Sequence, residues 1–200
     1  MIHAPLTPEL IETSIARSLS RLATDHVDVF ALHAPAVQDV TRDDVLRALE
    51  AVLRRGQARY LAVAGDLSAG LAAAAGGRFA VIQLADDPRG DSLDQVRAAA
   101  KAPVATISHS VFGVGGAREV LAAHLASDAA LRDQAAAAGF DGPPAQTAAE
   151  LLLARAFAAN PQGVVLASMF GPGHLAANVA AASRPLDERV LAIVAAGLTA

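Results

Sequence analysis

The sequence predicts an α/β fold built on parallel strands, and three observations support this prediction. Five apolar segments of strand length alternate with helical segments along the 200 residues. At least one helix separates each pair of successive strands, which is the connection that parallel strands require. Hydrophobic residues make up 54% of the chain, enough for a sizeable core. The alternation alone fits an open doubly wound sheet and part of a barrel equally well.

The composition narrows the classes of function. The net charge is -4 without a long run of one sign, which does not favour binding to nucleic acid or to an anionic membrane. There is no cysteine, which excludes disulfides and cysteine metal sites and is compatible with a reducing cytoplasm. No signal peptide is visible, and the apolar stretch 190–200 is far shorter than the roughly 20 residues of a membrane-spanning helix. We expect one cytoplasmic domain over residues 1–200, since no linker divides the chain.

The first elements can be justified from local signals. Thr7-Pro8-Glu9 combines a capping hydroxyl, a proline in the first turn and an acid, so a helix is expected to begin there. Its buried face is predicted to comprise Leu10, Ile11, Ser14, Ile15, Leu19 and Leu22. The strand 27–33 has a nearly continuous apolar run, which predicts cover on both faces. Residues 41–44 predict a capping box ahead of the second helix, which Gly56 ends.

The same alternation continues to the end of the chain. Further strands are predicted over residues 59–64, 79–84, 103–108 and 163–167. Further helices are predicted at about 68–75, from a capping box at 92–95 onward, over most of 116–138 and 144–159, and over 172–183 and 185–197. The long helical section before the last strand is interpreted as an insertion with a loop at 139–144. The last helix is expected to face the core.

His33 is the first candidate for a functional residue. It ends the strand 27–33 and is followed by Ala34-Pro35. Ligands bind at the carboxyl ends of the strands in parallel α/β folds, so a histidine at this position can face a site. A histidine there can also simply hydrogen-bond within its own loop.

Three further segments place polar groups or glycines near strand ends. Gln83 lies inside a predicted strand, where a buried amide needs partners. The segment 108–116 is rich in glycine and precedes a helix, which favours an anion but is also typical of a flexible loop, and Arg118 would add a positive charge. The segment 164–178 combines a hydroxyl, a helix N-terminus and polar side chains one turn apart, which can converge on one spot.

Together these segments resemble the aldo-keto reductase family. Leu-His-Ala-Pro after an apolar strand is similar to the end of the family's fourth strand, where a histidine lies beside the reacting carbonyl. The resemblance therefore implies that His33 is a catalytic residue. It also implies that Gln83 binds the nicotinamide carboxamide of the cofactor. It covers nearly the whole chain but only about the last five of eight barrel units, so we expect a partial (β/α)8 TIM barrel with five parallel strands and flanking helices.

The resemblance assigns the remaining cofactor contacts to the later segments. The residues expected along the pyrophosphate are Ser110, Phe112 and Gly113. The residues expected at the adenosine phosphate end of NADPH are Ser168, His174 and Asn178. Ala167 stands where the family has a lysine, and His174 replaces the common arginine; histidine is mostly neutral at pH 7 and lacks the bidentate fork. A preference for a 2′-phosphate is therefore in doubt, and NADH is not excluded.

Other departures concern the nicotinamide end and the chemistry. Ala64 and Gly65 stand where the family has a serine and an asparagine that hold the carboxamide, although Asp66 could reach the same space. The family's catalytic Asp, Tyr and Lys would precede Met1. The single tyrosine, Tyr60, and the single lysine, Lys101, are expected on the far side from the site.

We therefore expect a truncated NADP-dependent oxidoreductase for a small-molecule carbonyl substrate, inactive by itself. The alternatives are a non-catalytic protein that binds a dinucleotide or another ligand, and an assembly module that pairs through exposed strand edges, for example as a homodimer.

Overall fold

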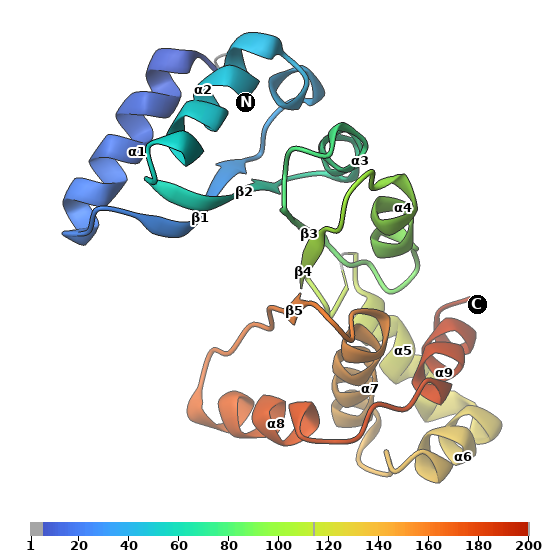
Figure 1. Cartoon of the computed structure of the whole chain (residues 1–200). Coiled ribbons are helices and arrows are strands. Elements are labelled where there is room, and N and C mark those ends of the chain that lie inside the picture. Colours follow the sequence, from blue (N-terminus) through green and yellow to red (C-terminus); the bar gives the residue numbers. More distant parts are fainter. Residues whose placement is uncertain (1–5, 114, 200) are drawn as a thin grey trace. The chain divides into compact units, whose positions relative to one another are not determined.

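The structure, a computed structural model, describes residues 6–113 and 115–199 (Figure 1). The described chain divides into two compact units, the first up to Leu84 with Asp94–Thr106, and the second comprising Ala85–Leu93 with the residues from Ile107 onward. Whether the chain is one domain stays a prediction. All strand pairs with a defined register are parallel, which confirms the predicted class of fold: β1 pairs with β2 and β2 with β3 in the first unit, and β4 with β5 in the second.

The helices and strands alternate as predicted. In chain order the elements are α1 (Pro8–Leu22), β1 (Val27–His33), the 3-10 helix η1 (Val37–Val40), α2 (Asp43–Arg54), β2 (Ala58–Ala64), α3 (Leu67–Gly76), β3 (Val81–Ala85), α4 (Ser92–Ala99), β4 (Ala105–His109), α5 (Ala117–Ser127), α6 (Ala129–Ala137), α7 (Pro144–Ala159), β5 (Val164–Val165), α8 (Pro172–Ala182) and α9 (Arg189–Leu198).

Helix α1 begins as its sequence predicts, but its buried face is narrower. The hydroxyl of Thr7 accepts a hydrogen bond from the backbone N–H of Leu10 at 3.2 Å, which confirms the cap. The buried residues of the helix are Ile11, Ile15 and Leu19. Leu10, Ser14 and Leu22 are exposed, so their place on the buried face was wrongly predicted. The helix presents a single stripe to α2, and both leucines lie beyond that stripe.

The capping box predicted at residues 41–44 is wrong. The hydroxyl of Thr41 donates instead to the carbonyls of Val37 and Gln38, which belong to η1. Arg42 becomes the capping residue of α2 and makes no side-chain cap bond. The Thr41 hydroxyl thus bonds to a 3-10 helix, which the periodicity of the sequence did not reveal. The end of α2 is as predicted, since Gly56 follows it at a φ of 69°.

One face of β1 is open to solvent, so the prediction that β1 is covered on both faces is wrong. Val29 and Tyr60 are register partners on neighbouring strands and are 42% and 54% exposed. Leu32, which alternates to the opposite face of β1, is buried. An apolar run therefore marks a strand here without indicating how many of its faces are covered.

The later elements differ from the sequence prediction mainly in their bounds. β3 and β4 begin two residues later than expected, and β5 comprises only Val164–Val165. The helical stretch predicted over 116–138 is divided at Asp128, whose carboxylate accepts hydrogen bonds from the backbone N–H groups of Ala130 and Leu131. Asp128 thereby begins a new helix, α6, instead of continuing α5.

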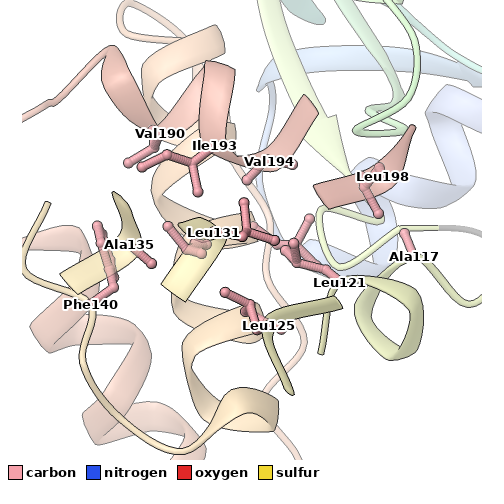
Figure 2. Packing of buried hydrophobic residues seen from close by; sticks show 13 residues of the cluster. Ala117, Leu121, Leu125, Leu131, Ala135, Phe140, Val190, Ile193, Val194 and Leu198 are labelled. Carbon is pink, nitrogen blue, oxygen red and sulfur yellow. The ribbon is translucent and has the colours of Figure 1, made fainter. Parts of the chain in front are cut away.

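The core of the second unit lies among α5, α6, α7 and α9 (Figure 2). The last helix faces this core, as predicted: Val190, Ile193 and Val194 are almost completely buried. Gly197 allows α9 to approach α5, because a Cβ at this position would lie 2.3 Å from the Cδ1 of Leu121. No helix within the described residues has the length and apolar content needed to cross a membrane.

Candidate functional site

His33 and Gln83 lie in one row across three neighbouring strands of the first unit. The register pairs His33 of β1 with Ala64 of β2, and Ala64 with Gln83 of β3. Register partners point to the same face, and each strand step is about 4.8 Å, so the Cα atoms of His33 and Gln83 are roughly 10 Å apart. His33 is exposed and Gln83 is half-buried. A flat ligand lying over Ala64 could contact both side chains.

The turn after β1 packs tightly against the end of β2. Ala34 adopts a left-handed conformation with φ of 50°, and its N–H donates to the carbonyl of Ala64 at 2.6 Å. A Cβ on Gly65 would lie 3.3 Å from the Cδ of Pro35. This close contact leaves little room for a side chain at position 65.

Asp66 serves as the cap of α3. Its Oδ1 accepts hydrogen bonds from the backbone N–H of Ala69 at 2.8 Å and from the hydroxyl of Ser68 at 2.9 Å. The Ala69 N–H, and then the Ser68 hydroxyl, lower the pKa of the Asp66 carboxyl below its usual value. The carboxylate of Asp66 therefore caps α3, although the sequence suggested that this side chain could reach the carboxamide.

Tyr60 and Lys101 lie away from the row of His33 and Gln83. Tyr60 precedes Ala64 by four residues on β2, which places it roughly 13 Å along the strand from that row. Lys101 is exposed after α4, and its N–H donates to the carbonyl of Ala74. Neither side chain is placed to donate a proton beside His33.

The second unit contains a cavity of about 430 Å³ between α7 and α8. This volume falls in the range of small-molecule sites. Its lining residues are Phe112, Arg118, Ala145, Gln146, Ala149, Glu150, Leu153, Ser168, Phe170, His174, Ala177, Asn178 and Ala181. Four predicted cofactor residues, Phe112, Ser168, His174 and Asn178, are therefore brought together, with Arg118 beside them.

Helix α8 supplies one wall of this cavity. His174 and Asn178 are four residues apart, so both side chains lie on the same side of the helix. The amide Nδ2 of Asn178 donates to the backbone carbonyl of Ser168 at 3.4 Å, which ties the loop after β5 to the helix. Pro172 begins α8 with its fixed φ, so the loop ends at a defined point.

Helix α7 supplies the facing wall with two polar residues that sequence reasoning missed. The Nε2 of Gln146 donates to the Oε1 of Glu150 at 2.8 Å, and the Nη2 of Arg184 lies 3.5 Å from its Oε2. Phe170, also missed, contributes an aromatic ring to the lining. The spacing of Gln146 and Glu150, one turn apart, was the available signal, but the segment was interpreted as an insertion.

The predicted pyrophosphate loop forms a tight turn. The N–H of Gly113 donates to the carbonyl of Ser110 at 2.8 Å, and both residues have a positive φ, 87° and 58°. A Cβ on Gly113 would lie 2.3 Å from the Cβ of Ala117, so the turn requires glycine. Ser110 and Gly113 are outside the cavity lining, and Val114 lies outside the described residues.

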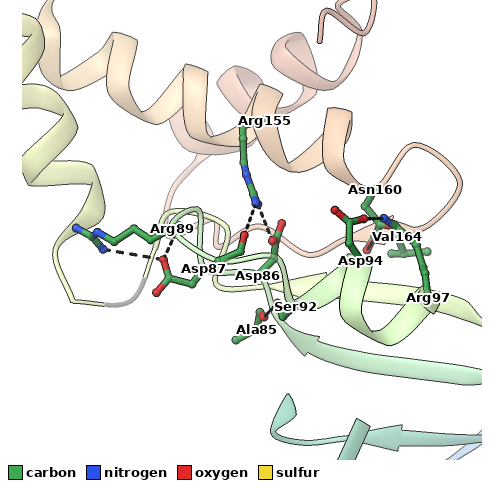
Figure 3. Close-up of polar contacts among 11 residues, drawn as sticks. Ala85, Asp86, Asp87, Arg89, Ser92, Asp94, Arg97, Arg155, Asn160 and Val164 are labelled. Atoms are coloured by element: carbon green, nitrogen blue, oxygen red, sulfur yellow. Dashed lines mark hydrogen bonds and ion pairs between the residues drawn. The ribbon is translucent and has the colours of Figure 1, made fainter. Parts of the chain in front are cut away.

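A buried ion pair fixes α7 to the loop after β3 (Figure 3). The Nη1 of Arg155 lies 2.6 Å from the Oδ1 of Asp86, and the two residues are 8% and 1% exposed. The Nη2 of Arg155 donates to the carbonyl of Gly90 at 3.4 Å, and the N–H of Asp86 donates to the carbonyl of His109. The pair thereby holds the helix that forms one wall of the cavity.

Comparison with known proteins identifies the family. The model of the aldo/keto reductase family matches residues 1–197, whereas no curated protein matches the chain. Among solved structures, an aldo-keto reductase from Bacillus halodurans in its holo form is 19% identical, with a TM-score of 0.68, 96% of this chain covered and 68% of that one. An aldo/keto reductase from Brucella melitensis is 17% identical, with a TM-score of 0.68 and coverage of 98% and 70%.

A Pseudomonas aeruginosa protein provisionally assigned as an aldo-keto reductase is 18% identical, with a TM-score of 0.64 and coverage of 90% and 59%. This chain therefore spans between 59% and 70% of the length of these three structures. The likeness to the structures shows the fold, in which five parallel strands with flanking helices correspond to part of a TIM barrel. Because the family model matches residues 1–197 of 200, the chain belongs to the aldo/keto reductase family.

Proposed function

We propose that this chain carries the cofactor-binding part of an oxidoreductase that uses a nicotinamide dinucleotide, and that the cavity between α7 and α8 takes the adenosine end. The observation that carries this proposal is the convergence of Phe112, Ser168, His174 and Asn178 on one cavity. The family resemblance assigned all four to the cofactor by their positions in the sequence. NADPH is the cofactor that the resemblance implies.

The residues of the cavity fit an adenosine nucleotide. The Ser168 hydroxyl, the Asn178 amide and the Arg118 guanidinium can donate hydrogen bonds to phosphate, ribose or base. The rings of Phe112 and Phe170 offer faces on which a purine can stack. This mixture of aromatic, amide, hydroxyl and cationic groups supports a nucleotide more than a purely apolar ligand.

The family resemblance assigns the groups around the reacting end to Gln83 and His33. A bound dinucleotide of this kind supplies a hydride to a carbonyl carbon. Gln83 would hydrogen-bond the carboxamide, and His33 would donate to the carbonyl oxygen of a small substrate and so orient it. Neither Tyr60 nor Lys101 lies in the row of His33 and Gln83, so no neighbouring group among the described residues completes the proton transfer.

A second candidate function is a binding protein without catalysis. Ala64 and Gly65 offer no side-chain hydrogen bonds at the place where the family holds the carboxamide. Saturable dinucleotide binding without turnover would favour this candidate. Assembly through strand edges, as a homodimer, is a third proposal, which light scattering of the purified chain would test.

Calorimetric titration of the purified chain with NADH and NADPH tests the proposed function. We expect saturable binding of at least one dinucleotide. The Asn178→Ala variant is expected to bind about three- to tenfold more weakly, because one amide hydrogen bond to the ligand is lost. Gln134→Ala, which removes an exposed amide on α6 away from the cavity lining, serves as the matched control. Absence of binding of both dinucleotides, or equal affinities of the two variants, would count against the proposal.

A further inference from the structure

We propose that the cavity of the second unit selects an adenosine ribose with a free 2′-hydroxyl, so that the chain prefers NADH to NADPH, and that Glu150 sets this preference. The inference rests on the proposed function, in which the cavity takes the adenosine end of a nicotinamide dinucleotide. It adds that the adenosine ribose carries a free 2′-hydroxyl, and that Glu150 selects this form.

The cavity contains little positive charge. A phosphate monoester carries a charge of about −1.5 to −2 at pH 7 and is usually held by several cationic groups. Arg118 is the single arginine among the described lining residues, and no lysine lines the cavity there. Its Nε lies 3.9 Å from the Oε1 of Glu119, so its charge is shared with a carboxylate.

The segment that would hold the 2′-phosphate adds no permanent charge. Between Arg155 and Arg184 the sequence contains no lysine, arginine, aspartate or glutamate. The ionisable side chain of this stretch is His174, which lacks both the permanent charge and the planar fork of an arginine. Phe170 lies soon after Ser168 in the sequence and also lines the cavity, and its aromatic ring carries no charge that could pair with a phosphate.

The facing wall of the cavity carries a carboxylate. The side chain of Glu150 is 23% exposed and lines the cavity. One of its oxygens accepts from Gln146 and the other pairs with Arg184. A carboxylate has about four lone-pair sites, so it can still accept a hydrogen bond from a ribose hydroxyl. A 2′-phosphate would meet a like charge at the same place.

Arg184 cannot replace Glu150 as the group that meets the ribose. Its Nη1 donates to the carbonyl of Gly139 at 3.2 Å, and its guanidinium carbon lies 4.6 Å from the centroid of the Phe140 ring. It is also outside the cavity lining. The cavity therefore presents the Glu150 carboxylate, while its partner Arg184 contacts Gly139 and Phe140 and does not line the cavity. A glutamate or aspartate that accepts from the ribose is the general arrangement that favours NAD over NADP in dinucleotide sites.

The experiment measures the dissociation constants of NADH and NADPH for three forms of the full chain. In the unmodified chain we expect NADH to bind on the order of tenfold more tightly than NADPH. Glu150→Gln keeps the shape of the side chain and removes its charge, so it is expected to bring the ratio close to one by strengthening NADPH binding. Glu188→Gln, which removes an exposed carboxylate outside the cavity lining, is the charge-matched control and should leave the ratio unchanged.

Each outcome decides the inference. Tighter binding of NADPH by the unmodified chain would overturn the preference and leave the proposed function standing. An unchanged ratio in a folded Glu150→Gln variant, verified by circular dichroism, would overturn the role of Glu150. If that variant does not fold, Glu150→Asp, which keeps the charge and shortens its reach, should weaken NADH binding; equal affinity would overturn the role. If neither dinucleotide binds, the proposed function fails and the preference falls with it.

Discussion

Replacing Arg155 with alanine is expected to lower the free energy of unfolding by about 3–5 kcal/mol. The substitution would leave the carboxylate of Asp86 buried without its charged partner, since that residue is 1% exposed. It would also remove the hydrogen bond to the Gly90 carbonyl that ties the loop after β3 to α7. Urea denaturation followed by circular dichroism measures the effect.

Two further variants test whether the loss of stability arises from the burial of the Asp86–Arg155 pair. Arg189→Ala breaks an exposed pair with Asp187 at a similar distance, 2.6 Å, and is expected to cost far less stability than Arg155→Ala, because solvent screens this pair. Asp86→Leu combined with Arg155→Met removes both charges and should recover most of the loss. Equal destabilisation by Arg155→Ala and Arg189→Ala would contradict the assignment of Asp86 and Arg155 as a buried pair.

The 200-residue chain is expected to show no detectable carbonyl-dependent oxidation of NADPH or NADH. A positioned general acid contributes roughly 10²- to 10⁴-fold to such a reaction, and Tyr60 is roughly 13 Å along β2 from the row of His33. A spectrophotometric assay with small aldehydes, at cofactor concentrations that saturate binding, checks this prediction. Robust turnover that disappears in His33→Ala would show that the chain completes the proton transfer in a way that the geometry does not reveal.

Much of the fold could be predicted because its signals are local. Thr7 caps α1 through a contact three residues away, and β1 has the bounds that its apolar run indicates. The prediction of a capping box at residues 41–44 was wrong because the Thr41 hydroxyl donates to carbonyls of the 3-10 helix that precedes it. The prediction that β1 is covered on both faces was wrong for another reason. The side chains that cover a strand come from elsewhere in the chain, so the strand's own sequence does not contain them.

The candidate site was predictable where its members follow one another closely. Ser168, His174 and Asn178 lie within a single strand–loop–helix segment, so their spacing was enough to place them together. Glu150 was missed because α7 is rich in alanine on all sides, and its sequence does not indicate which face meets α8. Arg155 and Asp86 were missed because each needs a partner far away in the sequence, and a charged residue in a helix usually faces solvent.

The central claim is that the cavity between α7 and α8 holds the cofactor, and hydrogen–deuterium exchange with and without saturating NADH tests it most directly. We predict slower exchange of backbone amides over residues 145–153 and 168–178, which form the two walls, and unchanged exchange over 11–22 in α1. NADH binding without added protection in either wall would contradict the claim.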